Sequence, residues 1–143
     1  MGVKIIKTGK VVILLTGRYA GKKAIVVSAF EKNSKRPFQH ALVAGLERSP
    51  RKVTKSMNKA QILRRSRVKP FVKYVNVAHL MPTRYQVSDI EVKSVASPER
   101  VDKISLRKQV RGSLKSVFTK ALFKKPTEKN ATATEYFFKK LRF

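Results

Sequence analysis

The strongest structural signal in the chain is the segment GKVVILLTGRYAGKKAIVV, which spans residues 9–27. Two runs rich in β-branched residues, 11–15 and 24–27, flank a loop that is bounded by Gly17 and Gly21. Such runs are typical of strands, and the short loop between them predicts a β-hairpin. Apolar side chains occupy both alternating sets of positions in the first run. This pattern indicates a strand that is buried on both faces, as in a small barrel or under another layer.

Further strands are expected downstream of the hairpin. The segment EKNSKRP (31–37) predicts a turn, and QHALVAGL (39–46) predicts the next strand, in which Gly45 marks either a bulge or a crowded crossing. The segment FVKYVNV (71–77) returns to strand character. HLMPTRY and QVSDIEV, which together span 79–92, close the β region near residue 92.

The C-terminal third predicts a helix followed by a tail. Ser97 suits a helix start because proline and an acid follow it, but Asp102 and Ser105 are equally acceptable caps. Apolar residues then recur with the helical period, which predicts an amphipathic helix that ends at KKP (124–126). Its apolar positions are Val110, Leu114, Val117, Phe118, Ala121 and Leu122. The remaining residues, NATATEYFFKKLRF (130–143), are expected to form an extended basic and aromatic tail.

Composition narrows the function. The chain has 143 residues, with 34 Lys and Arg against 8 Asp and Glu, so its formal net charge is +26. Hydrophobic residues make up 42% of the chain, which is enough for a buried core. Because like charges this dense oppose folding, the expected partner is a polyanion. The longest apolar run, 11–15, is too short to span a membrane.

The sequence disfavours an enzyme. The chain contains no cysteine, which excludes disulfides, thiol nucleophiles and Cys-based zinc sites. His40 and His79 are its only imidazoles, and each lies in an apolar stretch, so a core or RNA-facing role is favoured over a catalytic pair or a metal site. GRYAGKK differs from a Walker-type phosphate loop because three residues, not four, separate its glycines. We expect no cofactor, metal or small-molecule substrate.

A second signal is the basic run from residue 51 to residue 73, which holds nine Lys and Arg and no acid. Such an unbalanced segment is typical of an arm along an anionic surface. RRSRVK (64–69) is also compatible with a nuclear-import signal. We expect the arm and the tail to be mobile in the free protein.

The hairpin resembles the KOW motif, an RNA-associated element of SH3-like barrels in ribosomal and transcription-elongation proteins. The matching residues are Gly9, Val11, Leu15, Gly17, Gly21 and Val26, and Ala24 stands where many members have a third glycine. The resemblance implies that the loop residues face RNA.

Three longer segments resemble the 27e family of eukaryotic large-subunit ribosomal proteins. They are HALVAGLERSPRKVTKSM (40–57), KPFVKYVNVAHLMPTRY (69–85) and YFFKKLRF (136–143). The resemblance implies a structural constituent of the large ribosomal subunit, in the cytoplasm after nuclear and nucleolar passage. Its implied partners are large-subunit ribosomal RNA and neighbouring ribosomal proteins, with no membrane.

The expected fold is therefore mainly β, with an SH3-like barrel of KOW type over residues 1–92, a basic loop inserted at about 49–69, and a helical extension with a tail over 93–143. RNA is expected to contact Arg18, Tyr19, Lys22, Lys23, Arg51, Lys52, Lys55, Arg64, Arg65, Arg67, Lys69, Lys73, His79, Arg84, Tyr85 and Arg142. The main alternative is a KOW-containing RNA-binding regulator of transcription elongation. A DNA-packing protein would share the charge but not the barrel. A binding preference for structured RNA over duplex DNA would distinguish the ribosomal protein from it.

Overall fold

A computed structural model describes residues 5–124 and 131–142. Its elements in chain order are β1 (Lys10–Leu14), β2 (Lys23–Phe30), β3 (His40–Arg48), α1 (Lys59–Arg65), β4 (Lys69–Asn76), the short 3-10 helix η1 (Val77–His79), β5 (Leu80–Gln86), α2 (Val92–Val95), α3 (Pro98–Asp102), α4 (Ile104–Phe123) and α5 (Ala131–Phe138). The strands predicted around residues 11–15, 24–27, 39–46 and 71–77 are all present.

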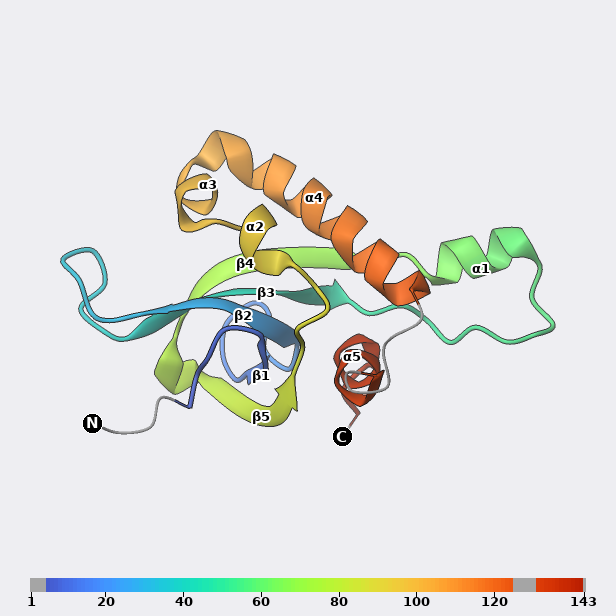
Figure 1. Cartoon of the computed structure of the whole chain (residues 1–143), viewed down its shortest axis with the longest axis horizontal. Coiled ribbons are helices and arrows are strands. Elements are labelled where there is room, and N and C mark those ends of the chain that lie inside the picture. Colours follow the sequence, from blue (N-terminus) through green and yellow to red (C-terminus); the bar gives the residue numbers. More distant parts are fainter. Residues whose placement is uncertain (1–4, 125–130, 143) are drawn as a thin grey trace.

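The five strands form one antiparallel sheet in the order β4-β3-β2-β1-β5. The sheet curls so that β5 comes back beside β1, as Figure 1 shows. Within residues 5–124 and 131–142, β4 and β5 do not pair, so the barrel-like sheet stays open between them. The mainly β fold with a small barrel-like sheet is thus confirmed.

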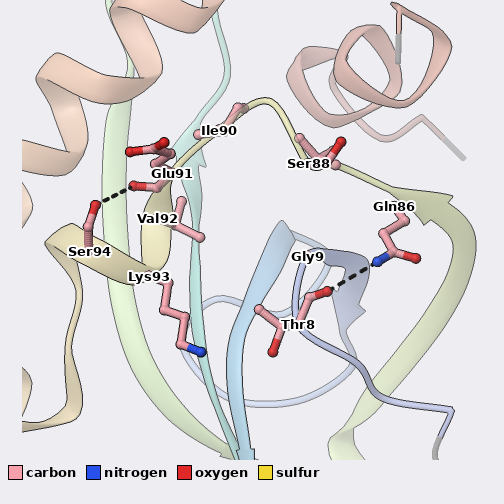
Figure 2. A pocket seen from close by; sticks show the side chains of 10 residues that line it. Thr8, Gly9, Gln86, Ser88, Ile90, Glu91, Val92, Lys93 and Ser94 are labelled. Atoms are coloured by element: carbon pink, nitrogen blue, oxygen red, sulfur yellow. Dashed lines mark hydrogen bonds between the residues drawn. The ribbon is translucent and has the colours of Figure 1, made fainter. Parts of the chain in front are cut away.

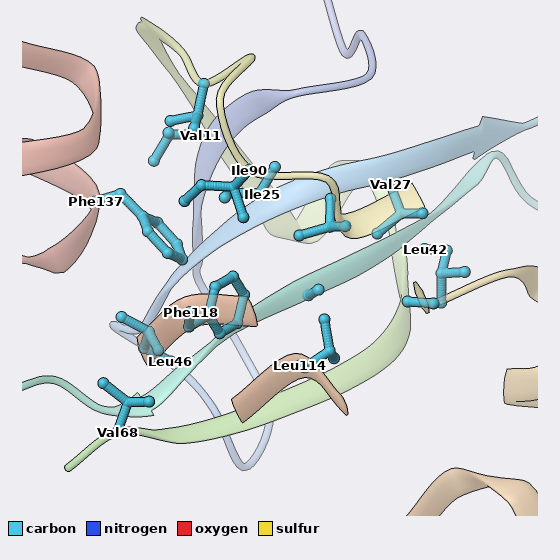
Figure 3. Close-up of a cluster of buried hydrophobic side chains, with 14 of the residues drawn as sticks. Val11, Ile25, Val27, Leu42, Leu46, Val68, Ile90, Leu114, Phe118 and Phe137 are labelled. Carbon is cyan, nitrogen blue, oxygen red and sulfur yellow. The ribbon is translucent and has the colours of Figure 1, made fainter. Parts of the chain in front are cut away.

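Alternate side chains of the central strands supply two separate cores. Val12, Leu14 and Val26 point to the inner, concave side of the sheet, where Phe71 also lies. The intervening residues, such as Val11 and Ile25, point to the other side and meet the helices (Figure 3). Because both faces are covered, strands β1 and β2 are apolar at consecutive positions, as the sequence predicted.

Helix α4 covers the outer face of the sheet (Figure 1). Val110, Leu114 and Phe118 are buried in its contact, which confirms the predicted amphipathic helix. The helical region predicted to begin near Ser97 contains the short helix α3 and then α4. Ser97 precedes α3, whereas Lys103 precedes α4, so neither Asp102 nor Ser105 is the cap. Lys124 follows the last residue of α4, and the remainder of the predicted KKP stop lies outside the described residues.

The expected extended tail is wrong for residues 131–138, which form helix α5. Phe137 and Phe138 are buried, and their ring centroids lie 5.4 and 6.4 Å from that of Phe118. An isolated helix this short is not stable in water, so tertiary burial of its aromatic face stabilises it. The aromatic residues of the tail therefore belong to the core.

The basic loop contains a helix of its own. Helix α1 is capped by Asn58, whose side chain accepts a hydrogen bond from the backbone N–H of Gln61, while Gln61 bonds back to the cap. The loop is closed at its base, where the N–H of Arg51 donates to the carbonyl oxygen of Arg65 at 2.7 Å. Figure 1 shows α1 projecting from the body. No residue of α1 is buried, as expected for a segment outside the core.

The two predicted segments, 1–92 and 93–143, contribute to a common core. Val11 and Ile25 from the sheet belong to the same cluster of buried side chains as Leu114 and Phe137 (Figure 3). The division at residue 92 stays a prediction.

Candidate nucleic-acid interface

The hairpin loop between β1 and β2 is shaped by its glycines. Gly17 and Gly21 have φ angles of 90° and 79°, which residues with a Cβ rarely adopt. The N–H of Gly21 donates to the carbonyl oxygen of Leu14 at 2.7 Å and closes the loop. Arg18 is exposed in this loop and Lys22 is half-buried at its end.

Tyr19 anchors the loop to the sheet. Its ring stacks on that of Phe71, with centroids 4.1 Å apart and planes 7° from parallel. The guanidinium carbon of Arg18 and the Nζ of Lys73 lie 5.5 and 5.9 Å from the centre of the Tyr19 ring. One ring face is thus occupied within the protein, and the ring holds two cations beside the loop.

An open groove of ≈ 660 Å³ begins at this loop. Segments far apart in the chain form its walls: the hairpin loop, the residues after β3, the start of β4, and residues 139–141. We call it the basic groove. Its charged lining residues are Arg18, Lys22, Lys23, Glu47, Arg48, Arg51, Lys69, Lys139 and Lys140.

Glu47 is the acid of the basic groove, and it is paired with Lys69. Its Oε2 lies 3.4 Å from the Nζ of Lys69. The pair is largely solvent-exposed on the lysine side, so it contributes little to stability. The remaining cationic side chains of the groove give it a strongly positive character.

A smaller cleft of ≈ 240 Å³ adjoins the groove. Arg18 and Lys69 line both concavities, and helix α4 adds Arg111 and Lys115 on the far side of the cleft. The two concavities together form one basic surface that runs from the C-terminal segment across the hairpin loop to α4.

Lys23 departs from the predicted set because its side chain points inward. Only 6% of the residue is exposed, and its Nζ donates hydrogen bonds to the carbonyl oxygens of Tyr136 and Lys139 at 2.8 and 2.7 Å. Burial lowers the pKa of the Lys23 ammonium, and the nearby charge of Lys139 lowers it further. We therefore leave Lys23 out of the RNA-facing residues.

Among the predicted cations of the arm, Arg51 and Lys69 line the basic groove, and the others lie apart from it. Lys52 and Lys55 are exposed on the loop, and Arg64 lies on α1 beside Arg51. The Nε of Arg65 donates to the carbonyl oxygen of Lys52 at 2.7 Å, so Arg65 also helps to shape the arm. Arg67 and Lys73 are exposed on the way into β4 and along it.

The remaining predicted residues lie elsewhere. His79 is exposed in η1, and Arg84 is exposed in β5, where its Nη2 donates to the hydroxyl of Tyr85 at 3.2 Å. The Tyr85 ring stacks on that of Tyr136 at 4.2 Å and so contacts α5. Arg142 is exposed after the end of α5.

His40 is a core residue and forms no pair with His79. It is 2% exposed, its Nδ1 lies 3.1 Å from the carbonyl oxygen of Phe38, and its ring packs near those of Phe30 and Tyr74. Within the part of the chain that the structure describes, no group of three His, Asp or Glu side chains is placed to hold a metal ion. In the same residues no helix is long and apolar enough to cross a membrane.

A separate pocket of ≈ 540 Å³ lies between the entry to β1 and helix α2 (Figure 2). The amide of Gln86 donates to the carbonyl oxygen of Thr8 at 3.4 Å, and Ser94 donates to that of Glu91 at 3.3 Å. Its lining contains both Glu91 and Lys93, so it lacks the uniform charge of the basic groove.

Sequence reasoning missed Arg48, Lys139, Lys140, Arg111 and Lys115 as members of one surface. For α4 a signal was present, because its polar face is rich in Lys and Arg. For Lys139 and Lys140 no local signal existed, since their place beside the hairpin depends on how α5 packs.

Comparisons with known proteins agree with one another. The chain matches the Ribosomal L27e protein family over residues 11–143. It is 50% identical over 143 residues to the large ribosomal subunit protein eL27 of Tetrahymena thermophila, covering 98% of this chain and 99% of that protein. It is 44% identical over 141 residues to eL27 of Candida albicans and 42% identical over 141 residues to eL27B of Saccharomyces cerevisiae, with 98% of each chain covered.

Proposed function

This chain belongs to the ribosomal L27e protein family, and on that premise we propose that it is a structural constituent of the large ribosomal subunit that binds ribosomal RNA through the phosphate backbone. The observation that carries the RNA contact is the basic groove, where cations from separate parts of the chain converge around the Glu47–Lys69 ion pair. The proposal includes no catalytic step and no cofactor.

The proposed mechanism is neutralisation and positioning. Lys and Arg side chains displace counterions from RNA phosphates, and this release supplies most of the binding free energy at low salt. Strands and the short hairpin loop hold Arg18, Lys22 and Lys69 in fixed relative positions. Such contacts orient RNA segments and select them by shape rather than by base sequence.

We assign the residues as two groups. The basic groove and its cleft would hold one stretch of RNA backbone through Arg18, Lys22, Arg48, Arg51, Lys69, Arg111, Lys115, Lys139 and Lys140. The arm would reach a second stretch through Lys52, Lys55, Arg64 and Arg67, because α1 projects away from the body (Figure 1). Tyr19 and Arg65 support these groups from within.

The assigned partners are large-subunit ribosomal RNA and neighbouring ribosomal proteins. We propose that the chain acts in cytoplasmic ribosomes after passage through the nucleus and nucleolus. Density-gradient sedimentation of a gentle lysate, with and without magnesium chelation, tests the assignment. The chain should travel with whole ribosomes and stay with the large subunit after chelation and a moderate salt wash. Its recovery at the top of the gradient, or with chromatin or polymerase, would refute the assignment.

A salt titration tests the phosphate contacts. Binding of the full chain to protein-free large-subunit RNA is measured at several KCl concentrations for Arg18→Gln and for Lys32→Gln, an exposed residue of the β2–β3 turn outside the groove. Loss of one phosphate contact reduces the slope of log K against log salt by about 0.7–0.9. Arg18→Gln should show this loss and Lys32→Gln should not. Equal slopes for the two variants would exclude the groove as the contact surface.

A further inference from the structure

We propose that Lys23 is a positioning residue of the RNA interface, which fastens the end of α5 to the hairpin and so places Lys139 and Lys140 along the basic groove. The inference rests on the proposed function. The sequence predicted that Lys23 contacts RNA directly. Here it acts instead by placing Lys139 and Lys140.

The geometry around the Lys23 ammonium is the first support. Its Nζ donates to the carbonyl oxygens of Tyr136 and Lys139 at 2.8 and 2.7 Å, and it lies 3.8 Å from the centre of the Tyr136 ring. The carbonyl groups in the last turn of a helix have no partners within the helix and carry partial negative charge. Lys23 therefore caps the C-terminal end of α5, and it does so from the start of strand β2.

The neighbouring lysine is the second support. Lys22 directly precedes β2 and Lys23 is its first residue, and both line the basic groove, but their side chains are held differently. Lys22 is half-buried at the wall of the groove, whereas Lys23 is 6% exposed and held by α5. Lys22 is thus placed for direct contact with RNA, and Lys23 is placed to position the end of α5.

The weakness of α5 on its own is the third support. The helix has eight residues, too few for stability in isolation, and its aromatic face fixes it to the core through Phe137 and Phe138. Those contacts bury the side chains of the last two residues of α5. The bonds from Lys23 hold the backbone of the same end and of Lys139 just beyond it, and so set the direction in which residues 139–141, which line the groove, leave the helix.

A double-variant cycle in the full chain tests the inference, with binding to protein-free large-subunit RNA as the readout. Lys139→Ala/Lys140→Ala should lower the salt slope by about 1.5, as expected for two phosphate contacts. Lys23→Met should lower it by a similar amount, yet should lower it no further in the Lys139→Ala/Lys140→Ala background. Lys22→Met is the matched control and should lower the slope by about 0.8 in both backgrounds.

Additive effects of Lys23→Met and Lys139→Ala/Lys140→Ala on the salt slope would overturn the inference, as would an unchanged slope in Lys23→Met. A second measurement uses the wild-type chain and needs no substitution. Lysine acylation, followed by mass spectrometry, should modify Lys22 rapidly in the free protein and spare Lys23. If Lys23 reacts as fast as Lys22 and is shielded only by RNA, it contacts RNA and the inference fails. Failure of the wild-type chain to bind the RNA at all would instead refute the proposed function.

Discussion

Replacing Gly45 with alanine should destabilise the protein by about 2–4 kcal/mol. Gly45 lies in β3, and an added Cβ would meet the carbonyl oxygen of Lys23, the Cζ of Phe71 at 2.7 Å and the Cβ of Ala24 at 2.8 Å. Overpacking of this kind costs about 1–3 kcal/mol. Relief through Phe71 would also disturb its stacking on Tyr19, and such a pair contributes about 0.5–1.5 kcal/mol.

Urea unfolding followed by circular dichroism, with linear extrapolation to water, measures the change in the free energy of unfolding. Gly112→Ala is the matched control, because Gly112 lies in α4 and a Cβ there meets nothing within 4 Å. This second variant should be more stable than the wild type by about 0.5–1 kcal/mol, because alanine is the better helix former. If Gly45→Ala unfolded at the wild-type urea concentration, the close approach of β2 and β4 to β3 described above would be refuted.

Three further changes probe the core, the ionisation of one tyrosine and the arm. Phe118→Ala should lower the free energy of unfolding by about 3–5 kcal/mol, since Phe118 is fully buried; a loss below about 1 kcal/mol would contradict the described packing. Burial, together with the charge of Asp102 and a hydrogen bond to it, raises the pKa of Tyr74 from 10.0 to about 12. The folded state therefore keeps the phenol proton longer than the unfolded state does, and the stabilisation present below pH 10 is lost as the pH rises toward 12. In a pH series of urea unfolding, Tyr74→Phe should lack this component of the loss, and parallel curves for the two proteins would refute it. Asn58→Ala removes the capping bond to Gln61 and should weaken α1 by about 1 kcal/mol. Hydrogen exchange should become faster at residues 59–65 with an unchanged global unfolding midpoint, because no α1 residue is buried; a shifted midpoint would show that α1 is part of the cooperative core.

The strands were predictable because their signal is local. Val11 and Val12 are both apolar, and the structure explains this by the two cores on opposite faces of β1. Gly45 was recognisable as a special position for the same reason, since a glycine inside an apolar strand requires a close neighbour.

Helices α1 and α5 were missed for different reasons. The capping pattern of Asn58 and Gln61 was present in the sequence, but the dense positive charge around it favoured a loop interpretation. Helix α5 is too short for a periodic pattern and is stabilised by burial against Phe118, which local sequence does not reveal. The loop cations Arg18 and Lys22 could be proposed from the hairpin alone. The contribution of residues 139–141 could not, because it depends on contacts across most of the chain.

The bond that joins Lys23 to Lys139 also has a consequence for the order of events during synthesis. The two residues are 116 positions apart, so the hairpin leaves the synthesising ribosome long before its partner exists. During that interval the wall of the basic groove formed by residues 139–141 is missing, and the Lys23 ammonium cannot donate hydrogen bonds to the carbonyl oxygens of Tyr136 and Lys139. A nascent chain therefore presents an incomplete basic groove, and the finished geometry appears only when translation has passed residue 139.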